Sequence, residues 1–380
     1  MAWKIPLFKI YWDEEDVKSV AEAIKVGMNW AVGPNVEKFE KIIAKYIGAK
    51  YCVVFNSGTS ALHAALLAHE IKQGDEVIVP SFTFIATANA PLFVGAKPVF
   101  ADIEEETFGL DPEDVKEKIT EKTRAIIPIH YGGCACKIRE LKEIAEDYNL
   151  ILIEDAAESL GARIGNEKVG TFGDSAIFSF CQNKIITTGE GGAIATDSRE
   201  VYKKLKLIRS HGRLESSDYF SSAEYMDYIT VGYNFRISNI TAALGTAQLK
   251  KVDEIIKMRR KNAEYMTKKL SKTKEIIPPN PPLDYFHVYQ MYTITIDMGR
   301  KIRDNLAKYL AEKGIMTKVY FSPVHLTHFY KNELGYTCKL PVTEEISSQV
   351  LTLPMYPTLT REEMDYMVEK IKSFCEVLER

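Results

Sequence analysis

The chain has 380 residues, of which 46% are hydrophobic, so it can bury a large core, and its length suggests two domains. A formal net charge of −3 excludes the basic field typical of nucleic-acid-binding proteins, and no apolar run approaches membrane-spanning length. Six scattered cysteines are typical of reduced thiols rather than of a disulfide framework, and they do not have the spacing of a metal site. Because the first residues also lack the apolar stretch of a secretory signal, we expect a soluble, cytoplasmic protein.

The first half of the chain alternates between amphipathic helical patterns and short runs that are apolar throughout. The expected helices, in chain order, span residues 13–26, 36–47, 60–70, 87–94, 111–119 and 138–148. The expected strands span residues 51–55, 76–79, 98–101, 125–129 and 151–153. Strands that are apolar on both faces and separated by helices predict an α/β protein, with a mostly parallel sheet covered on both sides.

The pattern changes after about residue 173. Two expected strands, 174–180 and 192–196, bracket a loop, and a long helical pattern over 238–270 follows. The remaining expected elements are a strand at 288–296 and helices at 302–313 and 361–378. We therefore expect a large domain over residues 1–250 and a smaller C-terminal α+β domain over residues 251–380.

Two ionisable residues stand next to expected strands. Lys184 lies in the loop between 174–180 and 192–196, and Asp155 follows the apolar run 151–153. Taken singly, a lysine is usually a solvated surface group, and an aspartate after a strand is often a helix cap or a metal or ribose ligand. Together they are the two groups that a pyridoxal 5′-phosphate (PLP) enzyme needs from its protein. The lysine forms the Schiff base, and the acid pairs with the pyridine nitrogen.

A candidate phosphate site lies upstream of these residues. Ser57-Gly58-Thr59-Ser60 precedes an expected helix, where free backbone N–H groups, hydroxyls and the helix dipole all favour an anion. The same pattern is ordinarily only a helix cap, so its interpretation as a phosphate site depends on Asp155 and Lys184. Phe84, after the strand 76–79, could stack on a flat cofactor ring, or it could be an ordinary core residue.

Several motifs, in a fixed order, resemble the DegT/DnrJ/StrS family of PLP-dependent nucleotide-sugar aminotransferases, and the match runs nearly end to end. The motifs are Ile5-Pro6-Leu7, Gly33-Pro34, Asn56-Ser57-Gly58-Thr59-Ser60-Ala61-Leu62, Glu154-Asp155-Ala156-Ala157, Thr187-Thr188-Gly189-Glu190-Gly191-Gly192, Gly232-Tyr233-Asn234-Phe235-Arg236, Ala242-Ala243-Leu244-Gly245 and Leu353-Pro354. The resemblance implies the aspartate aminotransferase fold (PLP fold type I), a PLP-binding large domain, and a homodimer with shared active sites.

The resemblance also assigns roles to individual residues. Lys184 matches the Schiff-base lysine, and Asp155 matches the partner of the pyridine nitrogen. The other matches are Thr59, Ser60 and Ser179 for the phosphate, Phe84 for ring stacking, and Asn234 for a phosphate contact from the other subunit. The inter-subunit role of Asn234 comes from the resemblance alone, because the residues themselves indicate no more than a turn.

Position 158 departs from many members of the family. Glu158 stands where many have Gln or His beside the cofactor, and a carboxylate there would repel the cofactor's phenolate oxygen unless it is protonated or paired. Glu158, Asn183-Lys184 and the segment 230–234 resemble the family members that make perosamine, a 4-amino sugar. Val319-Tyr320 stands where members acting on acidic UDP-sugars have His-Tyr, which argues against such a substrate.

The resemblance implies an amino group moved from L-glutamate to a nucleotide-linked keto sugar, and it favours C4 of a GDP-linked 4-keto-6-deoxy sugar. A 3-keto sugar, or a dTDP- or UDP-linked 4-keto sugar, remains an alternative. His211, Arg213 and His325 are expected sugar or nucleotide contacts, and each could equally be an ordinary surface or interface residue. A sugar 3-dehydratase would carry histidine in place of Lys184, and a non-catalytic regulator on the same scaffold should have lost Lys184 or Asp155.

Overall fold

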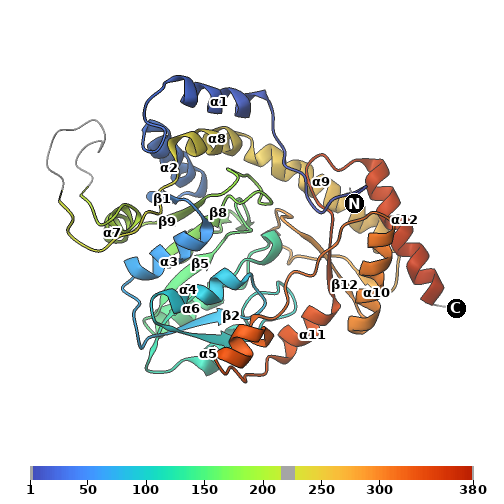
Figure 1. Ribbon diagram of the computed structural model, residues 1–380. Coiled ribbons are helices and arrows are strands. Elements are labelled where there is room, and N and C mark those ends of the chain that lie inside the picture. The colour runs from blue at the N-terminus through green and yellow to red at the C-terminus, as the bar shows by residue number, and fades with distance from the viewer. Residues whose placement is uncertain (1–2, 215–226, 379–380) are drawn as a thin grey trace.

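A computed structural model describes residues 3–214 and 227–378 of the chain (Figure 1). Within these ranges, a seven-stranded sheet has the order β1-β9-β8-β5-β4-β2-β3. Its strands are β1 (Tyr51–Phe55), β2 (Glu76–Pro80), β3 (Lys97–Ala101), β4 (Thr123–Ile126), β5 (Ile151–Asp155), β8 (Ser175–Ser179) and β9 (Gly192–Thr196). Only β9 runs against its neighbours, β1 and β8, so the predicted mostly parallel sheet is confirmed.

Both faces of this sheet are buried, as the uninterrupted apolar runs predict. Along β1, Cys52 and Val54 contribute to one core, whereas Val53 and Phe55 contribute to another on the opposite face. The first core is shared with α2 (Pro34–Ile47), α6 (Ile138–Asp147) and α8 (Asn239–Lys250). The second core is shared with α3 (Gly58–Ala68), α4 (Ile85–Phe93) and α7 (Arg199–Arg209). The predicted α/β fold, with a sheet covered on both sides, is therefore confirmed.

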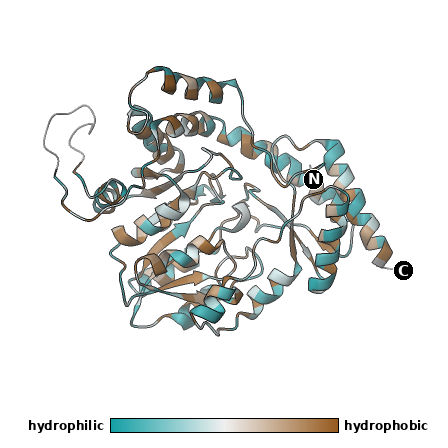
Figure 2. Cartoon of the chain, in the orientation of Figure 1, coloured by the Kyte–Doolittle hydropathy of each residue, from teal (hydrophilic) through white to brown (hydrophobic). Residues whose placement is uncertain are grey.

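A three-stranded antiparallel sheet forms the centre of the C-terminal part, with the order β10 (Ile276–Ile277), β12 (Tyr292–Ile296) and β13 (Val350–Leu353). Its core includes residues of α9 (Val252–Leu270), α10 (Gly299–Glu312) and α12 (Arg361–Leu378). Figure 2 shows hydrophilic and hydrophobic residues mixed along α10 and α12, as expected for helices with one buried side. The remaining α-helices and strands are α1 (Glu14–Lys25), α5 (Pro112–Lys118), α11 (Pro341–Gln349), and the short strands β6 (Arg163–Ile164), β7 (Glu167–Lys168) and β11 (Tyr285–Phe286). Three short helical turns, η1 (Tyr131–Gly133), η2 (Val324–Leu326) and η3 (Phe329–Glu333), complete the described elements.

The division of the chain at residue 250 stays a prediction. The long helical pattern over 238–270 is in fact two helices, α8 and α9, separated at Lys251, whose φ and ψ of −109° and 9° are not helical. The first turns of α9 pack in the core of the large sheet, and its last turns pack in the C-terminal core. Ile5, near the N-terminus, also lies in the C-terminal core and bridges to Ile315.

Other differences from the expected elements are local. The strand expected over 288–296 begins only at Tyr292, because Tyr289 has a φ of 52°, which an extended strand cannot accommodate. The helix α7 is absent from the elements expected from the sequence, although Ser198 caps it by accepting from the Val201 amide. Of the helices described within residues 3–214 and 227–378, none combines the length and the apolar character needed to cross a bilayer.

Candidate active site

The candidate residues gather at one edge of the large sheet. Parallel strands bring their carboxyl ends to the same edge, and in open α/β sheets this edge holds the ligand. The carboxyl ends of β1, β2, β5 and β8, together with the residues that follow them, supply in that order the segments 56–60, 81–84, 155–158 and 179–184. Residues that lie far apart in the sequence, such as Lys184 and Asp155, therefore belong to one cluster.

Asp155 ends β5 and is buried, with 3% of its surface exposed. Its Oδ2 accepts a hydrogen bond from the Thr87 hydroxyl at 2.7 Å, and its Oδ1 accepts from the Ala157 amide at 3.2 Å. Burial raises the pKa of the Asp155 carboxyl, whereas the two donors and the charge of Lys184 act in the opposite direction. The carboxylate is thus oriented by two hydrogen bonds and lies within electrostatic reach of Lys184.

Lys184 lies in a loop held at its base, where the Thr188 amide donates to the Phe180 carbonyl at 3.0 Å. Its Nζ is 3.3 Å from Oε1 of Glu158, and the two side chains are 14% and 6% exposed. The other oxygen of Glu158, Oε2, accepts from the Gly132 amide at 3.0 Å. The carboxylate at position 158, which the sequence required to be paired or protonated, is therefore paired with the lysine ammonium.

The segment expected to bind phosphate begins α3. Ser57 is the N-cap, and its hydroxyl accepts from the Ser60 amide at 3.1 Å. The amides of Gly58 and Thr59 come too early in the helix to have a carbonyl partner within it. Ser179, at the end of β8, lies against this turn, since a Cβ on Gly58 would be only 3.0 Å from the Cβ of Ser179. The structure therefore brings the predicted phosphate residues together, as a helix N-terminus with adjacent hydroxyls.

Phe84 and Asn234 are both exposed. Phe84 is the N-cap residue of α4 and is 58% exposed, an arrangement open to a stacking role. Asn234 is on a segment whose backbone carbonyl accepts from the Asn56 side chain at 3.4 Å, next to the start of α3. The same segment pairs with Ser210 after α7. The roles of both residues stay predictions.

Two of the expected sugar contacts lie together, and the third lies elsewhere. His211 and Arg213 follow α7, close to the Asn234 segment, and Arg213 donates to the Ser210 hydroxyl at 3.2 Å. His325 is buried, and its ring nitrogens lie 2.6 Å from the Ser81 hydroxyl and 3.4 Å from a Glu344 oxygen. Because both nitrogens of His325 have partners within the protein, the geometry favours a structural role there, and its contact with substrate stays a prediction.

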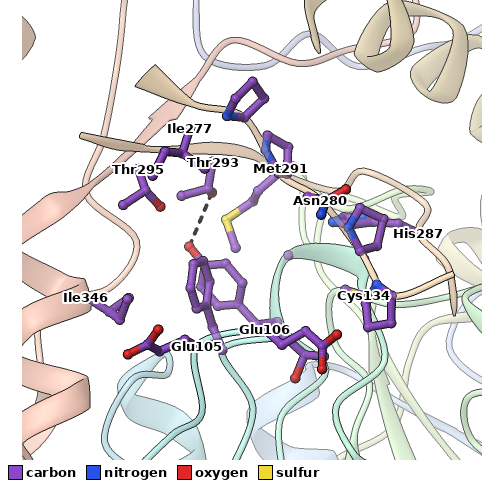
Figure 3. Close-up of a pocket in the computed structure, with 18 of the residues that line it drawn as sticks. Glu105, Glu106, Cys134, Ile277, Asn280, His287, Met291, Thr293, Thr295 and Ile346 are labelled. Carbon is purple, nitrogen blue, oxygen red and sulfur yellow. Dashed lines mark hydrogen bonds between the residues drawn. The ribbon is translucent and has the colours of Figure 1, made fainter. Parts of the chain in front are cut away.

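A groove that the sequence did not indicate is lined in part by Tyr131 and Gly132 (Figure 3). It has a volume of about 770 Å³, and the Tyr131 hydroxyl in it lies 3.2 Å from that of Thr293. Glu105 and Glu106 also line it. Since Gly132 both lines the groove and donates to Glu158, the groove and the Lys184 cluster share one segment of backbone.

These residues fit PLP on chemical grounds. A buried, doubly hydrogen-bonded carboxylate suits a pyridine nitrogen, a partly buried lysine suits the aldehyde, and the start of α3 suits the phosphate. The fold and this site define the class, a fold type I PLP-dependent enzyme. Within that class, the chain belongs to the DegT/DnrJ/EryC1/StrS aminotransferase family, whose model matches residues 11–372.

Similar proteins and solved structures support this family assignment. GDP-perosamine synthase of Escherichia coli O157:H7 is 35% identical over 370 residues, which cover 97% of this chain and 98% of the relative. GDP-perosamine synthase of Caulobacter vibrioides is 39% identical over 340 residues, 89% of each chain. Helicobacter pylori PseC, an aminotransferase involved in the biosynthesis of pseudoaminic acid, superposes with a TM-score of 0.92 at 28% identity, over 98% of this chain and 99% of that chain.

The cofactor is also represented among these structures. Spr1654 of Streptococcus pneumoniae, solved in a PLP form, has a TM-score of 0.90 at 26% identity, over 100% of this chain and 99% of that chain. The protein is therefore an enzyme, a PLP-dependent sugar aminotransferase that uses a nucleotide-sugar and an amino donor. This finding confirms the predicted family, enzyme class and cofactor. It argues against the alternative hypothesis that the protein is a non-catalytic regulator.

Proposed function

We propose that this enzyme transfers the amino group of L-glutamate to C4 of a GDP-linked 4-keto-6-deoxy sugar, with Lys184 and Asp155 as its catalytic residues. The observation that carries the proposal is the contact of Glu158 with Lys184, which puts the residue typical of perosamine-forming members directly beside the reacting amine. Similarity to two GDP-perosamine synthases supports the same substrate. Val319, in place of the histidine of members acting on acidic UDP-sugars, points away from that alternative.

In this proposal Lys184 is the group that moves the proton. When bound, PLP supplies an electron sink that stabilises negative charge on the carbon that loses its proton. The Lys184 amine takes the proton from the α-carbon of glutamate and later delivers a proton to C4 of the sugar, as general base and then general acid. Glutamate leaves as 2-oxoglutarate before the sugar is aminated, so we expect ping-pong kinetics.

The other residues hold the reactants. Asp155 accepts from the protonated pyridine nitrogen, and Glu158 accepts from the Lys184 ammonium in the arrangement seen here. The start of α3, from Ser57 to Ser60, and the hydroxyl of Ser179 bind the phosphate, and Phe84 stacks on the ring. His211 and Arg213 face the nucleotide-sugar. In this scheme residues 1–250 are the PLP-binding domain and residues 251–380 are the small domain.

We further propose a homodimer in which Asn234 completes the site of the partner subunit. Exposed apolar side chains precede this residue in the chain: Val231 is 80% exposed, and Tyr228 and Ile229 are also exposed. Exposed apolar side chains favour burial against another chain, and in a twofold-symmetric dimer such a contact would be made by both subunits in the same way.

Mixing two variants tests this shared site, at a PLP concentration low enough that Asn234→Ala alone is inactive. Asn234→Ala should weaken PLP retention, and Lys184→Ala should remove the reacting amine. If Asn234 acts across the interface, a heterodimer of the two variants has one site in which both residues are intact. After unfolding and co-refolding of an equal mixture, we expect about a quarter of the wild-type activity, because half the dimers are mixed and half their sites are complete.

Each variant refolded alone is the control for this mixture. If Asn234 serves the site of its own chain, no dimer contains an intact site, and the mixture should be no more active than the separate variants. Unchanged PLP affinity in Asn234→Ala alone, measured by equilibrium dialysis, would remove the residue from the site altogether.

A panel of nucleotide keto sugars tests the substrate. The purified enzyme, loaded with PLP and L-glutamate, is incubated with GDP-, dTDP- and UDP-linked 4-keto-6-deoxy sugars and with a 3-keto sugar. Products are detected by mass spectrometry, and the carbon that carries the new amine is assigned by NMR. We expect the highest kcat/KM for the GDP-linked 4-keto sugar. Its kcat/KM should exceed that of the other sugars by roughly a hundredfold or more if polar side chains form hydrogen bonds with the guanine base. Preferential amination of any other member would contradict the proposed substrate and leave the enzyme class intact.

A further inference from the structure

A chain of buried hydroxyls leads to Asp155. Thr83 and Thr87 are each only 1% exposed, and their Oγ1 atoms are 2.8 Å apart. The Thr87 hydroxyl in turn lies 2.7 Å from Oδ2 of Asp155. Thr83 precedes α4, and Thr87 lies in its first turn, where its amide donates to the Phe84 carbonyl at 3.1 Å. The backbone of this turn therefore fixes the position of Thr87, and its hydroxyl is held between Thr83 and Asp155.

The direction of donation follows from chemistry. An ionised carboxylate only accepts, so Thr87 must donate its single proton to Asp155. The oxygen of Thr87 then accepts from Thr83, and hydroxyls linked in this way polarise one another. The Ala157 amide donates to the other carboxylate oxygen at 3.2 Å, so both oxygens of Asp155 are held. Each oxygen retains one lone pair for a further donor.

The Thr87 hydroxyl acts on the pKa of the Asp155 carboxyl. Burial raises the pKa of Asp155, and the bond from Thr87 is the largest of the influences that lower it, ahead of the Ala157 amide and the charge of Lys184. Glu158 raises it. The neighbouring ionisable pair, His130 and Glu154, is fully buried, and its members are bonded to each other at 3.0 Å.

We propose that Thr87, supported by Thr83, is a positioning residue that orients the Asp155 carboxylate and keeps it ionised for the pyridine nitrogen of PLP. This proposal rests on the proposed role of Asp155. A carboxylate that already accepts two hydrogen bonds has less affinity for a proton, so the proton that it shares with the ring stays on the ring nitrogen. Without Thr87, that proton moves toward Asp155, and the ring becomes a poorer electron sink.

Thr87→Val tests this proposal, because valine keeps the shape of threonine and removes the donor. The matched control is Thr246→Val: Thr246 is 5% exposed on α8, and among the described residues its hydroxyl has no hydrogen-bond partner. Thr87→Ser retains the donor and should behave as wild type. Thr83→Val removes only the outer hydroxyl and should have a smaller effect than Thr87→Val.

The main measurement is the PLP affinity of the apoprotein as a function of pH, followed by fluorescence titration. Removing a donor from a carboxylate raises its pKa, so Asp155 becomes protonated, and binding weakens, at a higher pH as the solution is acidified. We expect the acid limb of the affinity profile to move up by roughly one pH unit in Thr87→Val. In the loaded enzyme, kcat should fall about tenfold with an unchanged KM for the sugar. Thr246→Val should change neither quantity.

Asp155→Asn separates this proposal from the assignment on which it rests. If Asp155→Asn abolishes the acid limb while Thr87→Val matches Thr246→Val, the role of Thr87 is overturned and that of Asp155 stands. If Asp155→Asn also leaves the profile unchanged, the assignment of Asp155 itself fails. Should Thr87→Val not fold, as judged by circular dichroism, Thr83→Val decides the matter: an acid limb at the wild-type position would overturn the hydroxyl chain.

Discussion

Lys184→Ala is expected to abolish transamination and the visible absorption of the bound cofactor. The lysine is both the covalent attachment point and the group that moves the proton. Since general acid–base catalysis alone contributes about 10²- to 10⁴-fold, we expect kcat to fall by roughly 10⁴-fold or more. The measurement is the rate at which the GDP-linked 4-keto sugar is aminated, together with the absorption spectrum of the purified protein. Normal turnover in this variant would contradict the assignment of Lys184.

Because Lys184 forms an ion pair with Glu158, the Lys184→Ala variant needs a control that keeps a positive charge at this position. In Lys184→Ala, the buried Glu158 carboxylate keeps the Gly132 amide as a donor but loses its cation, and leaving a buried charge uncompensated is destabilising. Lys184→Arg keeps a positive charge beside Glu158, but a guanidinium stays protonated and does not serve as the reacting amine. We therefore expect Lys184→Arg to be as inactive as Lys184→Ala but more stable to heat. Such a result would separate chemistry from folding.

Asp155→Asn should cripple proton abstraction more than folding. The amide has nearly the same shape, yet it carries no charge to hold a proton on the pyridine nitrogen, and we expect kcat to fall by about 10²- to 10³-fold. Within the protein, the asparagine oxygen can accept from either Thr87 or the Ala157 amide, so one donor loses its partner, at a cost of about 1 kcal/mol. Because Asn has no charge to bury, part of this cost is offset, and the apoprotein should unfold at nearly the wild-type temperature.

Exchange of the α-proton of glutamate in heavy water isolates this step. The exchange, followed by NMR, reports proton removal without requiring the sugar. We expect it to slow in Asp155→Asn as much as kcat does, while Thr246→Val exchanges at the wild-type rate. A fully active Asp155→Asn enzyme would mean that the ring nitrogen is held by another group.

Local patterns in the sequence determined most of the elements. The apolar runs at 51–55, 76–79 and 151–153 are strands, as expected for short runs that are apolar on both faces and rich in β-branched residues. Asp13 and Ser57 cap the helices that they precede. These signals act over a few residues, so the printed sequence contains them in full. Lys184 and Asp155 were likewise recognisable, because few chemistries require a loop lysine together with a buried acid.

The contacts that build the site were decided by the tertiary structure alone. Thr87 and Asp155 are 68 positions apart, and their bond exists because α4 and the end of β5 meet at one edge of the sheet. The Gly132 donor to Glu158 depends in the same way on strand order, because these residues follow the neighbouring strands β4 and β5. The burial of His325 depends on its contacts with Ser81 and Glu344, which are also distant in sequence. Periodicity and capping specify where an element begins and ends, but they do not determine which strands are neighbours in the sheet. That order is set by packing of the whole core, and with it the surroundings of each catalytic side chain.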